Sequence, residues 1–346
     1  MFEQGADIDG VAPVVLVTWP DYPVADEDCG ALLTRARLDV RLRPRLGARS
    51  PEQLLEMAHD VVAAIVSVDP FDEHVLERCR NLRVIARTGV GIDAIDVEAA
   101  TRLGIAVTVT PGANEASVAD HTLAMILALN RRLVEHDSGV RHGEWNRTGK
   151  HTPTTLTGST VGLVGYGRIG RLVGDRLAGF GVRLVAYDPF PHRDGRAEHV
   201  GLDELLSVSD VVSLHVPLIP GTAALIGERE LALMRGDAVI VNTSRGAVVD
   251  EAALVAALRN GVIGGAAIDV FANEPPTGSD LLALPNVLLS PHIAGLSTAS
   301  VEEMTQRATA SVLDVLGGRV PADLANPAVV GTMRPPLFAH QKREAS

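Results

Sequence analysis

Four side chains that can carry charge or move a proton follow short apolar runs in the second half of the chain. They are Arg245, Asp269, Glu274 and His292, and the run before each one predicts a buried strand. A guanidinium binds anionic groups, an imidazole exchanges a proton near neutral pH, and a carboxylate orients an imidazole beside it. Ligands of doubly wound sheets bind at the carboxyl ends of the strands. We therefore expect these side chains to converge at one sheet edge.

A glycine-rich stretch precedes these residues, near the middle of the sequence. Gly165, Gly167 and Gly170 stand between an apolar run, residues 159–164, and a helical pattern. The first glycine permits a tight turn, the second lets the backbone approach a pyrophosphate, and the third lets helix and strand pack closely. Asp188 ends the next apolar run, where such a fingerprint places an acid on a ribose. This context predicts dinucleotide binding rather than a glycine-rich turn without a ligand.

Alternating strand and helix patterns surround this stretch on both sides. Strands are expected at residues 14–18, 62–67, 83–87, 105–109, 160–164, 182–187, 210–214, 237–241, 264–268 and 286–290, and long helices at 114–132 and 299–316. The alternation predicts an α/β protein with two doubly wound parallel sheets. We expect a Rossmann dinucleotide domain, residues 113–295, inserted into a flavodoxin-like substrate domain, residues 1–112 and 296–346. The cleft between the domains is the expected active site.

Length, charge and composition narrow the class of protein. A chain of 346 residues exceeds a single core, and its net charge of −12 disfavours nucleic acid as a partner. No apolar run reaches the ~18 residues that span a membrane, and the acidic start lacks the pattern of a signal peptide. We therefore expect no membrane partner and a cytoplasmic location. Cys29 and Cys79 are too isolated to predict a metal site.

The motifs resemble the D-isomer-specific 2-hydroxyacid dehydrogenase family, which includes phosphoglycerate dehydrogenases and glyoxylate/hydroxypyruvate reductases. The resemblance runs from about Val62 to Ala310 and rests on residues 165–170, 242–246, 269–275 and 290–295, with further similarity at 87–93 and 110–114. It implies an NAD-dependent oxidoreductase that interconverts a small D-2-hydroxy acid and its 2-oxo acid by hydride transfer. It also implies a homodimer.

The resemblance assigns a role to each residue of the expected site. His292 is the acid/base, Glu274 its carboxylate partner, and Arg245 the group that holds the substrate carboxylate. Expected substrate contacts are Val90, Gly91, Asn114, Arg245 and His292. Expected NAD contacts are Gly165, Gly167, Arg168, Ile169, Gly170, Asp188, His215, Val216, Pro217, Thr222, Thr243, Asp269 and Gly295. Asp188 favours NAD over NADP, because a 2′-phosphate would meet like charge.

Three further polar or aromatic residues receive structural interpretations. His215 is expected to matter through its backbone and its packing near the adenine, without acid/base chemistry. His121 is expected on a structural helix between the domains. Trp145 is expected to anchor the polar linker of residues 143–158.

Departures from the family pattern bear on the substrate. The segment Ser67–Asp72 has no Arg, where members that bind phosphorylated substrates carry one, and it holds two acids. Small unphosphorylated 2-oxo acids, such as glyoxylate or hydroxypyruvate, are therefore the leading candidates. Formate dehydrogenases carry Gln in place of Glu274, and phosphite dehydrogenases carry Lys in place of Val90. Two alternatives remain: an NAD-binding, corepressor-like scaffold without significant turnover, and a dehydrogenase of a specialised oxyanion such as phosphite or phosphonate.

Overall fold

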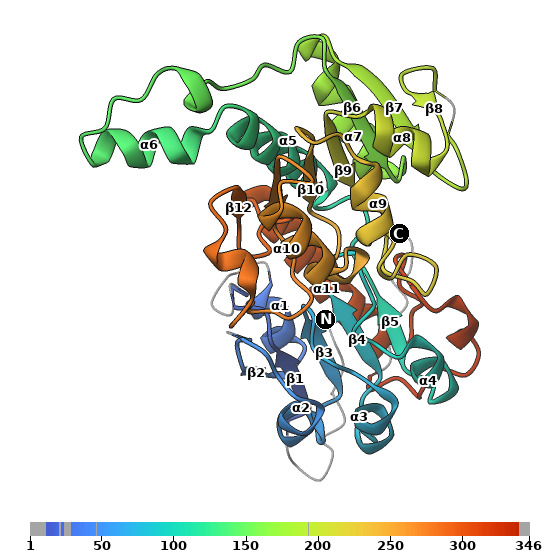
Figure 1. Ribbon diagram of the computed structural model, residues 1–346. Coiled ribbons are helices and arrows are strands. Elements are labelled where there is room, and N and C mark those ends of the chain that lie inside the picture. Colours follow the sequence, from blue (N-terminus) through green and yellow to red (C-terminus); the bar gives the residue numbers. More distant parts are fainter. Residues whose placement is uncertain (1–11, 21, 24–28, 46, 193, 339–346) are drawn as a thin grey trace. The chain divides into compact units, whose positions relative to one another are not determined.

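The two ends of the chain build one folded unit, and its middle builds another. The computed structural model describes residues 12–338 except 21, 24–28, 46 and 193 (Figure 1). It divides into Met1–Asn114 with Ser297–Ser346, the outer unit, and Glu115–Leu296, the inner unit. Each unit contains one sheet whose strands all run parallel.

The outer unit has a five-stranded sheet in the order β2-β1-β3-β4-β5, which is the flavodoxin-like order. Its strands are β1 (Val14–Val17), β2 (Asp39–Leu42), β3 (Ala63–Val66), β4 (Val84–Arg87) and β5 (Ala106–Thr108). Its helices are α1 (Gly30–Arg35), α2 (Pro51–Ala58), α3 (Glu73–Arg78), α4 (Val97–Arg102) and α11 (Thr298–Leu316). Apolar side chains of α1 and α11 pack on one face of the sheet, and those of α2, α3 and α4 on the other. The flavodoxin-like prediction is confirmed.

The inner unit has a seven-stranded sheet in the order β12-β11-β10-β9-β6-β7-β8. Its strands are β6 (Thr160–Val164), β7 (Arg183–Tyr187), β8 (Glu198–His199), β9 (Val211–Leu214), β10 (Val239–Asn242), β11 (Gly265–Ile268) and β12 (Val287–Leu289). Its helices are α5 (Glu115–Asn130), α6 (Leu133–Arg141), α7 (Arg168–Leu177), α8 (Leu202–Val208), α9 (Glu228–Leu233) and α10 (Glu251–Arg259). The strand order is that of a Rossmann fold with one strand added beyond β11, as predicted for this fold class.

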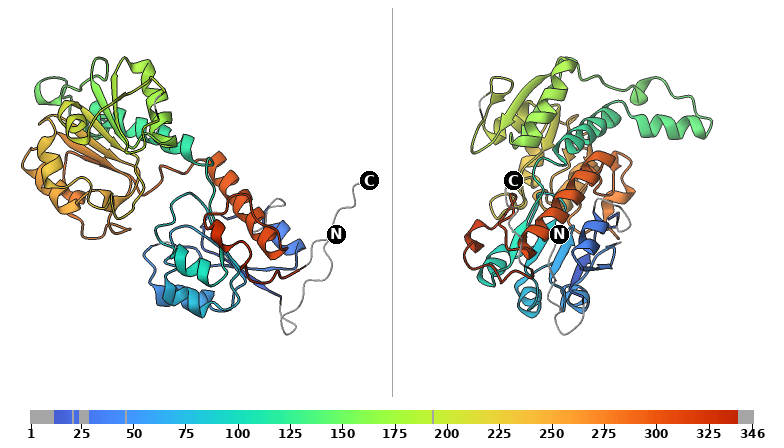
Figure 2. Two further views of the ribbon diagram at one scale, coloured as in Figure 1. Left: turned by 90° about the vertical axis from the view of Figure 1, so that its right-hand side faces the viewer. Right: turned by 180° about the vertical axis from the view of Figure 1, so that it is seen from behind.

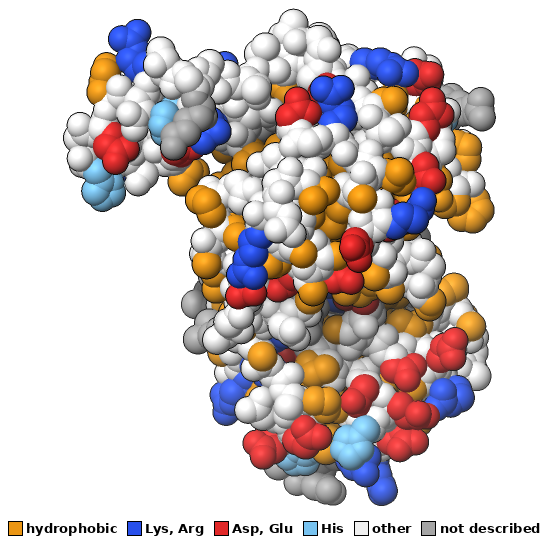
Figure 3. All heavy atoms as spheres, in the orientation of Figure 1, with side chains coloured by type: hydrophobic (Ala, Val, Ile, Leu, Met, Phe, Trp, Pro, Cys, Tyr) orange, Lys and Arg blue, Asp and Glu red, His pale blue; other side chains and the backbone are white. Residues whose placement is uncertain are grey.

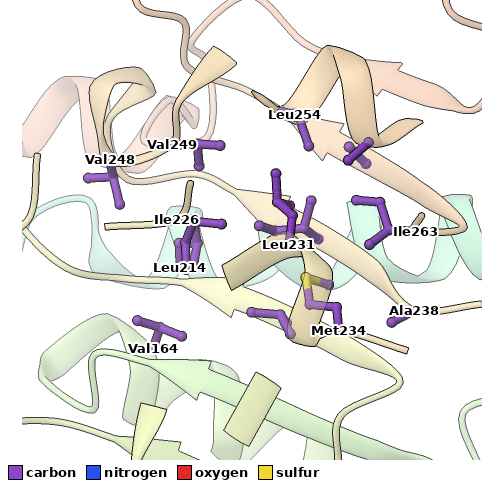
Figure 4. Close-up of a cluster of buried hydrophobic side chains, with 14 of the residues drawn as sticks. Val164, Leu214, Ile226, Leu231, Met234, Ala238, Val248, Val249, Leu254 and Ile263 are labelled. Carbon is purple, nitrogen blue, oxygen red and sulfur yellow. The ribbon is translucent and has the colours of Figure 1, made fainter. Parts of the chain in front are cut away.

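Buried aliphatic side chains fill both faces of the inner sheet. One face packs against α5 and α7, and the other against α8, α9 and α10 (Figure 2). Figure 4 shows the second of these clusters, where Leu214 of β9 and Ile226 lie among Leu231, Val248 and Leu254. Strands buried on both faces explain the continuous apolar runs in the sequence.

Four elements of the structure were not expected from the sequence. Strands β2 and β8 lie at sheet edges; no residue of β2 is buried, and β8 has only two residues. Neither α1 nor α6 has a side chain that caps its N-terminus. Short edge strands and uncapped short helices carry weak local signals, so the sequence could not mark them.

Helix α6 and the chain that follows it extend away from the inner sheet as an arm, residues 133–152 (Figure 1). No residue of α6 is buried, and Leu133, Val134 and Val140 are each more than half exposed. Trp145 is 72% exposed, so the expectation that it anchors this segment is wrong. Figure 3 shows hydrophobic side chains on the arm among charged ones. None of the helices in the described part of the chain has the length and hydropathy of a membrane-spanning segment.

The two acids of the segment Ser67–Asp72 are engaged within the outer unit. Asp69 is fully buried, and its carboxylate accepts hydrogen bonds from Thr18 Oγ1 and Arg49 Nη1, both at 2.5 Å. Asp72 caps α3, since its Oδ1 accepts from the backbone N–H of Val75 at 2.9 Å. A buried ion pair and a helix cap hold this segment in place, so its charge is compensated locally.

Removal of Arg49 tests how strongly this pair supports the outer unit. Arg49→Met leaves the buried Asp69 carboxylate without its cation, and we expect a loss of about 3–5 kcal/mol in the free energy of unfolding. Arg41→Met removes the partner of the more exposed Asp60, whose pair with Arg41 spans 2.6 Å, and should cost about 0–1 kcal/mol. Urea unfolding, followed by the fluorescence of the buried Trp19, measures both. Equal losses in the two variants would contradict this account.

Candidate active site

The glycine-rich stretch forms the turn between β6 and α7, and two of its three fingerprint glycines leave no room for a side chain. Gly165 has a φ of +95°, and a Cβ there would lie 2.8 Å from the backbone of His215. A Cβ on Gly170 would collide with the carbonyl oxygen of Gly165. Glycine is therefore required at both positions by local geometry.

Gly167 differs from these two, because a Cβ there would meet no protein atom within 4 Å. Gly167 is also the N-cap of α7, and no side chain caps this helix. The first N–H groups of α7 thus face space that a side chain at Gly167 would fill. A phosphate fits such a site, because helix N-termini bind anions through unpaired N–H groups and the helix dipole. The turn therefore fits the dinucleotide that the sequence predicted.

Asp188 lies at the end of β7 and holds the glycine turn. Its Oδ2 accepts from the backbone N–H of Tyr166, and its Oδ1 from that of Phe190, both at 2.8 Å. A carboxylate has about four lone-pair sites, so each oxygen can still accept a further bond. Tyr166 is itself buried, and its hydroxyl lies 3.3 Å from Asp194 Oδ1.

His215 follows β9 and supports the same turn from the other side. Burial lowers the pKa of His215 to about 4, so its ring is neutral at physiological pH. Its Nε2 lies 3.0 Å from Ser213 Oγ. A neutral ring held in this way suits a packing role and does not suit proton transfer at neutral pH.

Arg245 follows β10, and a glycine brings it close to the next loop. A Cβ on Gly246 would collide with the carbonyl carbon of Phe271, so only glycine lets the loops after β10 and β11 touch. Asn242 shapes the turn: its Nδ2 donates to the carbonyl oxygen of Arg245 at 2.9 Å, and its Oδ1 accepts from the N–H of Ser244 at 3.0 Å.

Glu274 and His292 form a hydrogen-bonded pair. His292 Nδ1 lies 2.8 Å from Glu274 Oε2, and Glu274 Oε1 accepts from the N–H of Phe271 at 3.1 Å. Burial raises the pKa of Glu274. The hydrogen bond and charge of His292, the Phe271 N–H and the charge of Arg245 outweigh burial and lower that pKa below its usual value. An ionised carboxylate only accepts, so Nδ1 carries its proton and Nε2 is left to exchange one.

Asp269 is fully buried and faces the loop that carries His292. Its Oδ1 accepts from the N–H of Ile293 at 3.0 Å, and its Oδ2 from that of Ala294 at 2.9 Å. Its own carbonyl oxygen accepts from the N–H of His292 at 2.8 Å. His292 has a φ of +55°, a left-handed conformation that non-glycine residues rarely adopt. Asp269 thus holds the backbone that presents the imidazole.

The remaining expected cofactor residues also lie in the inner unit. Arg168 begins α7 and pairs with Glu115 at 3.3 Å. The hydroxyl of Thr243 lies 2.9 Å from that of Thr122, and Thr222 Oγ1 accepts from the N–H of Ile219. The others are Ile169 on α7, Val216 and Pro217 after β9, and Gly295 in the loop after β12. These residues thus lie on α7 or in the loops that follow β9, β10 and β12.

The expected substrate residues are divided between the two units. Arg245 and His292 belong to the inner unit, whereas Val90, Gly91 and Asn114 belong to the outer unit. Val90 and Gly91 follow β4, where Arg87 Nε donates to the carbonyl oxygen of Gly91 at 3.0 Å. Val90 is 44% exposed in that unit.

Two residues of the site were not expected from the sequence as functional. Ser290 Oγ donates to Asp269 Oδ1 at 2.5 Å, and His121 of α5 contacts Ser290 in turn. Ser290 lies beside His292 in the sequence, but nothing local indicates that it reaches Asp269. Among the residues that the structure describes, no group of at least three His, Cys, Asp or Glu side chains could hold a metal ion.

Comparison with known proteins agrees with this geometry. Residues 123–294 match the model of the family "D-isomer specific 2-hydroxyacid dehydrogenase, NAD binding domain". The chain is 42% identical to a glyoxylate reductase of Thermococcus litoralis over 82% of its own length and 88% of that protein. It is 41% identical to a D-3-phosphoglycerate dehydrogenase of Mycobacterium tuberculosis over 80% of its length, but this match covers 53% of that protein.

A solved structure shows the same fold. The D-lactate dehydrogenase of Aquifex aeolicus, complexed with NAD and lactic acid, is 29% identical, with a TM-score of 0.82 over 90% of this chain and 99% of that one. Sequence identity above 40% across most of the chain, together with the matching NAD-binding domain, leaves one conclusion. The chain belongs to the D-isomer specific 2-hydroxyacid dehydrogenase family, with NAD as its cofactor.

Proposed function

We propose that this protein is an NAD-dependent oxidoreductase that reduces small, unphosphorylated 2-oxo acids to D-2-hydroxy acids, with glyoxylate or hydroxypyruvate as the leading substrates. The observation that carries the proposal is the 2.8 Å pair between His292 Nδ1 and Glu274 Oε2, near the charge of Arg245. This arrangement supports a role for His292 as the acid/base, with Arg245 nearby to bind an anionic substrate, in the unit that binds NAD. The glyoxylate reductase relative supports the substrate, because the chain spans 88% of that protein.

The chemistry follows from the pair of side chains. NADH, when bound, supplies the hydride to C2 of the oxo acid. His292 donates the balancing proton from Nε2 to the 2-oxo oxygen, while Glu274 stabilises the imidazolium before the proton leaves. Arg245 holds the carboxylate of the substrate through its planar fork and polarises the 2-oxo group. In the reverse direction the unprotonated imidazole takes the hydroxyl proton.

We assign further binding roles to residues of both units. Backbone N–H groups at Val90 and Gly91, with Asn114, are proposed to bind the substrate carboxylate. Asp188 is proposed to accept the adenosine ribose hydroxyls and to disfavour the 2′-phosphate of NADP. Asp269 is proposed to contact the nicotinamide carboxamide in addition to holding the His292 loop.

We further propose a homodimer that uses the arm and α5. A nine-residue helix is too short to be stable alone in water, and α6 has no buried residue within its own chain. A second copy would cover its exposed Leu133, Val134, Val140 and Trp145 with the same patch, as the isologous interface of a twofold dimer requires.

Turnover with a panel of 2-oxo acids tests the activity. We expect NADH oxidation with glyoxylate and hydroxypyruvate, and little with 3-phosphohydroxypyruvate. His292→Asn should lower kcat by about 10²–10⁴-fold, because it removes the proton donor, while NADH still binds. Steady-state kinetics and NADH fluorescence titration measure the two effects. Tight NADH binding without turnover of any acid would favour the scaffold alternative.

The pH profile tests the partnership of Glu274 and His292. The lowered pKa of Glu274 keeps it ionised at neutral pH, where it favours the imidazolium. Reduction needs the protonated ring and is lost as pH rises, so Glu274→Gln, which removes the negative partner 2.8 Å from the ring, should move this alkaline limb of the profile toward lower pH. The acidic limb of the oxidation, which needs the unprotonated ring, should shift in the same direction. kcat/KM measured in both directions across about pH 5–9 provides the check, and unchanged limbs would contradict the pairing.

A matched pair of surface variants tests the dimer. Val140→Asp places a charge on the arm, whereas Val320→Asp places it on the outer unit, and these valines are 56% and 55% exposed. Burial of an unpaired charge in an interface is costly, so only Val140→Asp should dissociate the dimer. Analytical ultracentrifugation reports the mass of each variant. A monomeric wild-type protein, or equal behaviour of the variants, would rule out this interface.

A further inference from the structure

A hydrogen-bonded chain connects α5 to the buried Asp269. His121 Nε2 lies 3.0 Å from Ser290 Oγ, and Ser290 Oγ lies 2.5 Å from Asp269 Oδ1. His121 Nε2 is also 3.6 Å from the same carboxylate oxygen. These contacts join a helix residue to the loop of His292, which is distant in sequence.

The donor and the acceptor of each hydrogen bond between His121, Ser290 and Asp269 follow from the chemistry of the groups. An ionised carboxylate can only accept, so Ser290 donates its hydroxyl proton to Asp269. The oxygen of Ser290 is then free to accept, and His121 must carry a proton on Nε2 to supply that bond. Successive bonds that point the same way polarise and strengthen one another. His121 therefore acts on Asp269 both through Ser290 and through its own nearby charge when protonated.

Asp269 in turn holds the backbone of the loop that carries His292. Its backbone and side-chain oxygens accept from the N–H groups of His292, Ile293 and Ala294. His292 is held in a left-handed conformation, which is strained for a non-glycine residue and persists only where the surroundings fix it. A shift of the Asp269 carboxylate would thus let this backbone relax and move the imidazole away from Glu274.

The side chains at the two ends of this hydrogen-bonded series, Asp269 and His121, differ in solvent exposure. The side chain of Asp269 is fully buried, whereas that of His121 is 23% exposed. A buried carboxylate needs several donors to offset its lost hydration; Ser290 and the loop supply them, and the hydrogen bond from His121 orients the Ser290 hydroxyl toward Asp269. A residue that only packed α5 against the sheet would need no such donor, because Ala119, Met125 and Ile126 already bury that face.

We infer that His121 is a positioning residue for the acid/base: through Ser290 and Asp269 it fixes the backbone that holds the His292 imidazole on Glu274. The inference rests on the proposed function for its catalytic consequence. It concerns the placement of the general acid, and His121 itself is given no contact with substrate or NADH.

Kinetics of paired substitutions test the inference. His121→Leu removes the donor and keeps an apolar side chain of similar size, whereas His121→Gln retains an N–H near the position of Nε2. We expect His121→Leu to lower kcat for glyoxylate reduction by about 10–100-fold, because small misplacements of catalytic groups are costly. The fall in kcat should exceed any change in KM or in the Kd for NADH, and His121→Gln should recover most of the loss.

The control applies the same change elsewhere. His59→Leu replaces a histidine of the outer unit whose Nδ1 lies 3.2 Å from the carbonyl oxygen of Glu56. This variant should keep the kcat of the wild type. Equal kcat values for His121→Leu and the wild type, or equal losses in His121→Leu and His121→Gln, would overturn the inference.

A second measurement does not depend on turnover. Proton NMR of the protein without cofactor should show a downfield resonance from His292 Nδ1–H, hydrogen-bonded to Glu274. It should broaden or disappear in His121→Leu and persist in His121→Gln and His59→Leu. If the wild type turned over no oxo acid, the proposed function would fail while this resonance still decided the role of His121. A resonance unchanged in His121→Leu would refute it.

Discussion

The buried carboxylate of Asp269 organises the chemical edge of the inner unit. It is fully buried, and its oxygens accept hydrogen bonds from a serine hydroxyl and two backbone N–H groups. Because a buried charge without donors is costly, the loop after β12 must stay where it supplies them. That loop carries His292, so the burial of one acid determines where the acid/base stands. Arg245 and Glu274 reach the same region through the close approach that Gly246 permits.

Environment gives different properties to the histidines that follow β9 and β12, His215 and His292. His215 is desolvated, which lowers its pKa to about 4 and leaves a neutral ring that supports the glycine turn. His292 faces a carboxylate whose own pKa is lowered, so the protonated ring has a partner. The same side chain thus suits packing after one strand and, in the proposed function, proton transfer after another.

Strong periodic signals explain why much of the fold was predictable from the sequence. Strands buried on both faces, such as β3, β4, β9 and β11, read as short apolar runs, and the glycine fingerprint fixed the Rossmann half. The missed elements were β2, β8, α1 and α6, which are short, lie at edges or bury little. The order of motifs likewise indicated Arg245, Glu274 and His292. The contact of His121 with Ser290 was missed, since it is set by the packing of α5 on the sheet.

The segment Ser67–Asp72 shows where charge counting from sequence fails. Its two acids suggested a surface that repels a substrate phosphate, yet one carboxylate is buried on Arg49 and the other caps α3. Arg49 lies well before this segment in the sequence, so no local pattern could reveal the pairing. The case against a phosphorylated substrate therefore rests on the missing arginine in this segment and no longer on repulsion. In the proposed function Arg245 and His292 contact only atoms that all 2-oxo acids share, so selectivity for small acids would come from groups that meet the distal end of the substrate.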